Sequence, residues 1–130
     1  MRLLDTDICI HLLNGREPDL IERLAAHRPP EIGLCSIVRA ELLWGARNSR
    51  RTDENVARVR AFAEPFQSLP FDDASAEHYG MIRADLTASG RPIGPNDTLI
   101  AAIARAHDAV LVTRNSREFS RVSGLEVEIW

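Results

Sequence analysis

Residues 1–10 read MRLLDTDICI, in which a short apolar run is followed by two acids. Leu3 and Leu4 predict a short buried strand, which Asp5 ends, and a second acid, Asp7, follows two residues later. A carboxylate at the edge of a core is costly unless it is paired or bound to a cation. Asp5 is therefore either the N-cap of a helix at 8–13 or a functional acid. Thr6 and Asp7 could cap that helix as well, which leaves Asp5 free for function.

The rest of the chain alternates short apolar runs with longer helical patterns, without a linker or an internal repeat. This alternation predicts a parallel sheet covered by helices on both faces, an α/β architecture. The length of 130 residues fits a single domain over 1–130. The predicted strands are 2–5, 32–35, 66–69, 109–113 and an edge strand at 126–129. The predicted helices are 8–13, 19–27, 37–47, 52–63, 74–88 and 97–107, with Ser36 as a candidate N-cap.

In parallel sheets, ligands bind beyond the carboxyl ends of the strands, which is where Asp5 is expected. Glu41 lies in an apolar helical stretch beyond the first turn, so the helix dipole explains it poorly. Asp97 follows Pro95-Asn96, where it or Asn96 could simply cap a helix. Asn115 and Glu118 follow the strand 109–113, where a turn role for the amide and a solvated position for the acid stay open.

The composition excludes several chemistries. The 16 basic residues are all arginine, and with 19 acidic residues the formal charge is −3, so bulk charge does not indicate a nucleic-acid partner. The DTD motif after a strand resembles haloacid-dehalogenase-type phosphatases. Those enzymes and the response-regulator receivers rely on a lysine that this chain lacks, so both are discounted.

The only potential metal ligands that the sequence pattern predicts to lie close together are oxygen atoms. The four histidines are scattered, and Cys9 and Cys35 lack the spacing of a zinc site, so we expect buried, reduced thiols. Several carboxylates suit Mg²⁺ or Mn²⁺ and would repel one another without a cation. Such ions promote in-line attack on a phosphodiester, so the acids indicate phosphoryl hydrolysis.

Four ordered blocks resemble the PIN-domain toxins of VapBC toxin–antitoxin modules. They are LLDTDICIHLL at 3–13, IVRAELLWGA at 37–46, IGPNDTLIAAIA at 93–104 and LVTRNSREFSRVSGLEVEIW at 111–130. The resemblance implies a three-layer α/β/α domain with a central parallel sheet. It also implies a Mg²⁺- or Mn²⁺-dependent endoribonuclease toxin that cuts a structured RNA such as tRNA.

By motif, Asp5, Glu41 and Asp97 match the three acids that hold metal in that family. The fourth acidic position falls in the block TRNSREF, where Asn115 takes the slot and Glu118 follows three residues later. Which of these two serves as the fourth site residue stays open at this point. Because asparagine carries no charge, a tightly held second metal is in doubt.

The resemblance also implies partners. We expect a VapB-type antitoxin that blocks the site and alone contacts operator DNA, and a homodimer of the toxin within that complex. Leu42, Leu43 and Trp44 are candidates for the antitoxin groove, with core packing as the alternative.

Local arginine clusters are the candidate RNA contacts. Arg47, Arg50 and Arg51 follow the Glu41 helix, and Arg114 and Arg117 flank Asn115, although solvated helix faces would look the same. Arg121 extends the second set.

Two other functions stay open from the sequence: a catalytically weak PIN-like binding module and a DNA-directed nuclease. The intact acids argue against the first, and no motif separates RNA from DNA. No stretch approaches the roughly 20 apolar residues of a membrane span, and no signal peptide is visible, so we expect a cytoplasmic protein.

Overall fold

The computed structural model describes residues 1–130 and contains one five-stranded parallel sheet in the order β3-β2-β1-β4-β5. β1 lies at its centre, with Leu3 opposite Gly33 on one side and Leu111 on the other. The strands are β1 (Arg2–Leu4), β2 (Ile32–Cys35), β3 (Gln67–Leu69), β4 (Val110–Thr113) and β5 (Val127–Ile129). All five predicted strands are therefore present.

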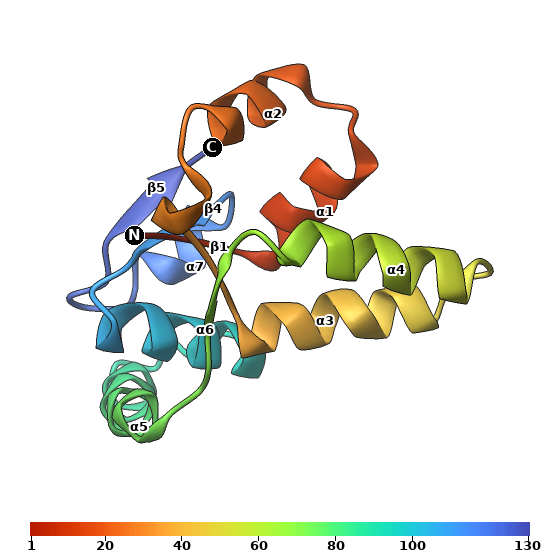
Figure 1. Ribbon diagram of the computed structural model, residues 1–130. Coiled ribbons are helices and arrows are strands. Elements are labelled where there is room, and N and C mark those ends of the chain that lie inside the picture. Colours follow the sequence, from red (N-terminus) through yellow and green to blue (C-terminus); the bar gives the residue numbers. More distant parts are fainter.

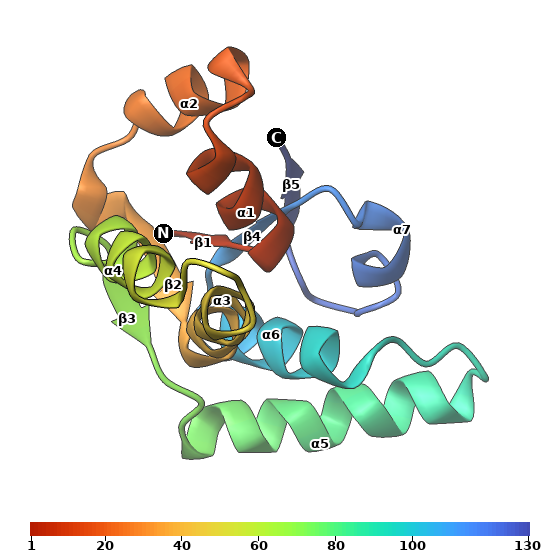
Figure 2. The ribbon, with the colours of Figure 1, turned by 90° about the vertical axis from the view of Figure 1, so that its right-hand side faces the viewer.

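Helices cover both faces of the sheet. Figure 2 shows α1 and α2 on one side of it and α5 and α6 on the other. This arrangement confirms the predicted α/β/α fold. The helices are α1 (Thr6–Asn14), α2 (Pro18–Ala25), α3 (Ser36–Arg47), α4 (Thr52–Ala63), α5 (Asp73–Ala88), α6 (Pro95–Ala106) and α7 (Ser116–Phe119), with a 3₁₀ turn, η1, at Pro29–Glu31.

The core forms because the central strands carry apolar side chains on both faces. Leu3, Leu4 and Leu111 are fully buried, as parallel strands between two helical layers require. On α6, Ile100 and Ile103 are buried together with three alanines, and these small residues let the helix pack closely between α5 and the sheet. No helix of the structure is both long and apolar enough to cross a bilayer.

The antiparallel pair α3 and α4 extends beyond the carboxyl edge of the sheet, as Figure 1 shows. Leu42 and Ala46 from α3 and Val56 and Val59 from α4 are buried, so an apolar seam holds the pair together. A hydrogen bond from Thr6 to Glu41 places the middle of α3 beside the carboxyl end of β1, whereas residues 48–51 connect α3 to α4 at the tip of the pair.

Two local predictions were wrong, and one element was missed. Cys35, not Ser36, is the N-cap of α3, and the Ser36 hydroxyl instead donates to the Leu69 carbonyl oxygen at 3.5 Å. The helix predicted at 97–107 begins at Pro95, whose fixed φ suits a first helical turn, so neither Asn96 nor Asp97 is its cap. The short helix α7 was not predicted, because four residues are too few to show a helical period.

Candidate functional site

Asp5 is a buried carboxylate with both oxygens engaged. It is 5% exposed and follows directly on the last residue of β1. Its Oδ1 accepts from the backbone N–H of Thr6 at 2.8 Å, and its Oδ2 accepts from the Thr113 hydroxyl at 2.7 Å. Asp5 is thus the N-cap of α1, as one interpretation of the sequence had it, and it is also a buried acid at the carboxyl edge of the sheet.

Thr113 connects the ends of two neighbouring strands. It is the fully buried last residue of β4, and besides donating to Asp5 it accepts from the backbone N–H of Asn115 at 3.0 Å. The Asn115 side-chain amide in turn donates to Glu118 Oε2 at 3.0 Å. One hydroxyl therefore fixes both Asp5 and the turn that carries the Asn115–Glu118 pair.

Glu41 reaches the same edge from the middle of α3. Its Oε1 accepts from the Thr6 hydroxyl at 2.9 Å. Because the backbone N–H of Thr6 also donates to Asp5, Thr6 links the two acids. The side chain is half-buried, with the apolar residues Leu42 and Val38 of the same helix packed into the core. This half-buried position agrees with the expectation that the helix dipole alone does not explain Glu41.

Asp97 shows how much negative charge gathers here. It lies in the first turn of α6, and desolvation, the Asp5 charge and the neighbouring Glu118 together raise its pKa to about 7. Glu41 adds a smaller effect in the same direction. The pKa of Asp5 is also raised, mainly by burial and despite its bonds from Thr113 and Thr6. Four acids are thus close enough to perturb one another.

The structure therefore brings together the four acids Asp5, Glu41, Asp97 and Glu118 from four separate blocks of the chain. Asp7 lies outside this hydrogen-bonded set: it is exposed on α1, although its charge contributes to the raised pKa of Asp5.

The chemistry of these donors fits a hard divalent cation. All are oxygen ligands, and the charge that raises the pKa of Asp97 is the charge that a cation would neutralise. No three His, Cys, Asp or Glu side chains of the chain converge on a single point. Mg²⁺ does not need such a cage, because it keeps several waters and uses one or two carboxylates together with substrate phosphates.

Thr6 and Thr113 are site residues that the sequence did not single out as such. Thr6 was considered only as a cap for α1, and Thr113 was taken as an ordinary strand residue. A hydroxyl residue ending the otherwise apolar run AVLV was the only available signal for Thr113, and its partner Asp5 lies 108 residues away.

The candidate RNA-contacting arginines differ in their surroundings. Arg47 and Arg50 are exposed near the tip of the α3–α4 pair, where Arg51 lies 3.7 Å from Glu54. Arg114 is engaged in the fold, with Glu17 at 2.6 Å and a bond from its Nε to the Trp130 carbonyl oxygen at 3.0 Å. Arg117 is exposed beside Glu118.

The histidines form no cluster, as predicted. His11 and His107 each contact one carboxylate, His78 accepts from Arg105, and His27 stacks on Trp130. Cys9 and Cys35 are free and buried, as expected, and burial raises the pKa of both thiols.

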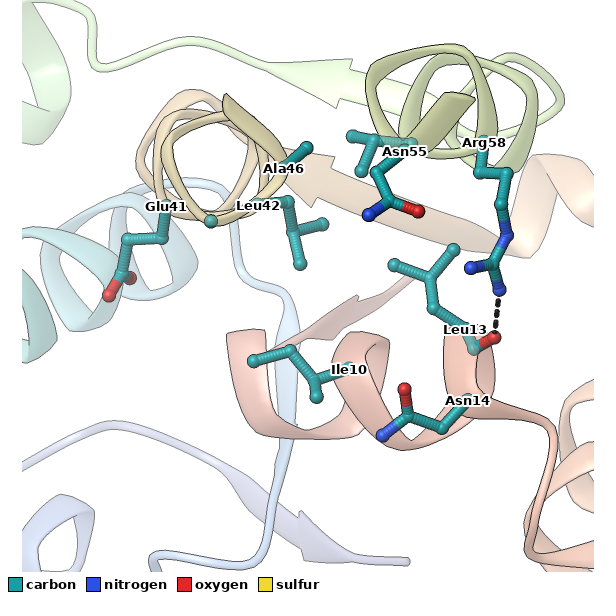
Figure 3. A pocket seen from close by; sticks show the side chains of 10 residues that line it. Ile10, Leu13, Asn14, Glu41, Leu42, Ala46, Asn55 and Arg58 are labelled. Carbon is teal, nitrogen blue, oxygen red and sulfur yellow. Dashed lines mark hydrogen bonds between the residues drawn. The ribbon is translucent and has the colours of Figure 1, made fainter. Parts of the chain in front are cut away.

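An apolar groove lies between α1, α3 and α4, beside the acids. Figure 3 shows the side chains of Ile10, Leu13 and Leu42 in it, and Glu41 of α3 also lines it. The groove has a volume of about 280 Å³, and Asn14, Asn55 and Arg58 also line it. Of the predicted groove residues, Leu42 is 5% exposed and belongs to the core, whereas Trp44 is 70% exposed.

Known proteins resemble this chain over its whole length. The sequence model of the PIN domain family matches residues 2–125. A tRNA(fMet)-specific endonuclease VapC of Shigella flexneri is 38% identical over 128 residues, which is 98% of this chain and 96% of that protein.

Two solved complexes share the fold. One is a DNA-bound VapBC from Salmonella typhimurium, with a TM-score of 0.94 and 36% identity, covering 99% of this chain and 97% of the other. The second is VapBC2 from Rickettsia felis, bound to a DNA fragment from its promoter, with a TM-score of 0.93 and 33% identity, covering 99% and 98% of the two chains.

Proposed function

The chain belongs to the PIN domain family, and from that premise we propose that it is a Mg²⁺- or Mn²⁺-dependent endoribonuclease, the toxin of a VapBC-type module. One observation carries the proposal. Asp5, Glu41, Asp97 and Glu118 come from four distant blocks and lie in one connected site at the carboxyl edge of the sheet. Four neighbouring acids repel one another when they are charged, and a bound cation would compensate that repulsion.

Asp5, Glu41 and Asp97 are the residues that would line the cation site, with one or two of their carboxylates as direct ligands and the rest reaching the ion through bound water. When bound, such an ion acts as a Lewis acid toward the phosphodiester and makes water a stronger nucleophile near neutral pH. The protein supplies the orientation. Thr113 and the backbone of Thr6 fix both oxygens of Asp5, and the Thr6 hydroxyl fixes one oxygen of Glu41.

Glu118 is the fourth acid in this proposal, and Asn115 positions it. The Asn115 amide donates to Glu118, and Glu118 is the group whose interaction helps to raise the pKa of Asp97. An asparagine at the family's acidic slot is therefore compatible with activity, because the negative charge enters three residues later.

A structured RNA such as tRNA is the proposed substrate. The endonuclease of Shigella flexneri at 38% identity is named for tRNA(fMet), and this chain covers 96% of that protein. Arg47 and Arg50 are exposed near the tip of the α3–α4 pair, with Arg51 beside them, and Arg117 is exposed next to Glu118. These arginines supply positive charge for backbone phosphates. Arg114, which Glu17 engages, contributes only where RNA displaces that acid.

A VapB-type antitoxin is the proposed partner, because the similar structures from Salmonella typhimurium and Rickettsia felis are VapBC complexes bound to DNA. The α1–α3–α4 groove offers an apolar floor of Ile10, Leu13 and Leu42 for an amphipathic helix. The amides of Asn14 and Asn55 at the groove can bind polar groups of that helix. The toxin would act as a cytoplasmic homodimer within that complex and contact operator DNA only through the antitoxin.

The test is substrate choice by purified, antitoxin-free protein. We expect discrete fragments from a tRNA pool with Mg²⁺, and no fragments from single- or double-stranded DNA of the same sequences. Glu41→Gln, which keeps the shape and removes the charge, should lose at least 100-fold in cleavage rate. Glu22→Gln, an exposed acid on α2, is the matched control. Cleavage of DNA at a rate equal to that of RNA, or a Glu41→Gln variant as active as the control, would refute the proposal.

A further inference from the structure

Trp44 is the most exposed of the large apolar side chains of the fold. It is 70% exposed on α3, whereas the other tryptophan, Trp130, is 8% exposed. Removing a tryptophan ring from water is strongly favourable, so a ring left in solvent beside a functional site is available to a ligand. Neither the core nor the hydrogen-bonded site uses this ring.

The ring borders a depression that runs into the acidic site. The depression has a volume of about 580 Å³, and Trp44, Ile10 and Ile37 line its apolar part. Glu41, Thr6 and Asn96 line its polar part. Thr6 follows Asp5, donates to Glu41 at 2.9 Å, and so joins the depression to the proposed metal ligands. Asn96 precedes Asp97 in the first turn of α6.

The spacing on α3 relates the ring to the acid. Trp44 is three residues after Glu41, so the two side chains lie on neighbouring parts of one helix face. The axial step between them is about 4.5 Å, which is within the reach of a single nucleotide from its phosphate to its base. A nucleotide whose phosphate lies at the acids would therefore place a base near the ring.

We propose that Trp44 is a stacking platform for one unpaired base of the RNA substrate, next to the phosphodiester that is cut, with the Asn96 amide facing the polar edge of that base. The inference rests on the proposed ribonuclease function and names how that site holds its substrate. Every base has a π-face, so stacking on Trp44 would position the RNA without reading its sequence.

The mixed lining favours a base over an apolar protein segment. A helix that covered Trp44 with apolar side chains would also bury the charge of Glu41, whose one partner is the Thr6 hydroxyl, and the side-chain amide of Asn96, which is costly. A base presents a flat ring to Trp44 and donors and acceptors at its edge to Asn96. The groove between α1, α3 and α4, which Trp44 does not line, is the apolar surface suited to a helix.

Tryptophan fluorescence tests the proposal independently of cleavage. Trp130→Phe leaves Trp44 as the sole tryptophan, and Asp97→Asn in the same chain prevents turnover. The probes are single-stranded eight-nucleotide RNAs of uridine, cytidine or adenosine, and an abasic ribose-phosphate oligomer of the same charge. We expect each RNA to quench the Trp44 emission and the abasic oligomer to leave it unchanged, with binding of all four followed by anisotropy.

Cleavage kinetics give the second measurement. Base–aromatic stacking is worth about 1–3 kcal/mol, so Trp44→Ala should raise KM for RNA by roughly 5- to 100-fold, and Trp44→Phe should restore most of the loss. Equal quenching by the abasic oligomer, or an unchanged KM in Trp44→Ala, would overturn the proposal. A Trp44→Ala variant that loses only antitoxin affinity or self-association would overturn it in favour of a protein occupant. Absence of cleavage by the wild-type protein would refute the ribonuclease function instead, and quenching by the three RNAs but not by the abasic oligomer would then still support stacking on Trp44.

Discussion

Asp97 is the residue at which the cost of gathering acids is largest. Its pKa is about 7 in the folded chain against 3.8 for an ordinary aspartate, because burial, Asp5 and Glu118 all disfavour its charge. Between these two values the folded chain binds a proton that the unfolded chain has released. Stability therefore falls as pH rises through this window, and the full loss is present above pH 7.

Asp97→Asn should remove this pH dependence from the metal-free protein. In EDTA at pH 8 the variant should be more stable than the wild type by on the order of 1–2 kcal/mol, a value reduced from the full shift because the side chain is partly solvated. At pH 5, which lies within the window from 3.8 to about 7, the difference should be roughly a third of that value. Urea unfolding at both pH values measures it, and Mg²⁺ should restore stability to the wild type more than to the variant. Parallel pH profiles for the two proteins would show that Asp97 does not carry this charge cost.

Thr113 supports the site through one hydroxyl. Thr113→Val keeps the shape but leaves Asp5 Oδ2 and the Asn115 N–H without their partner, so it should cost about 1–3 kcal/mol in unfolding free energy. It should also weaken Mn²⁺ binding, measured by calorimetry. Thr113→Ser, which keeps the hydroxyl and loses a methyl, is the control. Weaker Mn²⁺ binding in the Ser variant than in the Val variant would contradict the positioning role.

At the scale of elements, the strands were the most predictable part of the fold. Leu3-Leu4 and the run AVLV are apolar because both faces of a central parallel strand are buried, and this property is local in sequence. Cap positions were less predictable, since Ser36 found a distant partner in the Leu69 carbonyl. The helix α7 is held by the fully buried Phe119, a tertiary contact that no short pattern reveals.

In the candidate site, too, local features were predictable and long-range contacts were not. Asp5 and Glu41 were candidates because each acid interrupts an apolar pattern, whereas Asp97, at a position that suits a helix cap, stood out only together with the other acids and through the family motif. The links that join them were not predictable, because the Asp5–Thr113 bond spans 108 residues and the Glu41–Thr6 bond spans 35. The choice between Asn115 and Glu118 likewise needed the observed contact between them.

The tip of the α3–α4 pair is a candidate surface for RNA contact. Arg50 is exposed there, beyond the acidic edge, whereas Arg28 is exposed before the amino end of β2 and pairs with Glu31 at 2.8 Å. Arg50→Ala should weaken RNA binding and lower the slope of log affinity against log salt by about 1. Arg28→Ala removes the same charge and should leave the slope unchanged. Equal slopes for the two variants would remove the tip from the RNA interface.

Across the whole molecule, the two tryptophans have different expected roles: Trp130 stabilises the fold, and Trp44 is available to a ligand. Trp130 stacks on His27 with ring centroids 5.2 Å apart, and its indole N–H donates to Glu128 at 2.8 Å, so the C-terminal residue holds the loop after α2 against β5. Trp130→Ala should therefore lower the unfolding free energy by about 3 kcal/mol. Trp44→Ala, at an exposed position, should change it by less than about 0.5 kcal/mol. Urea unfolding compares the two, and a larger loss in Trp44→Ala would place the ring of Trp44 in the fold rather than at a ligand site.

The net charge of −3 is a property of the whole molecule. It opposes long-range attraction of RNA, so affinity must come from the local arginines and from a cation at the acids. Removal of the metal should then weaken RNA binding as well as cleavage, because the four acids would face the phosphates uncompensated.

Metal-dependent cleavage of RNA by the antitoxin-free protein tests the proposed nuclease most directly. Total RNA is incubated with wild-type protein in Mg²⁺, with the same protein in EDTA, and with Asp97→Asn in Mg²⁺, each shown to be folded by circular dichroism. Discrete fragments in the first reaction alone are the predicted result, and mapping their ends identifies the RNA that is cut. Fragments that persist in EDTA or with Asp97→Asn, or no fragments from folded wild-type protein in Mg²⁺ or Mn²⁺, would contradict a metal nuclease at this site.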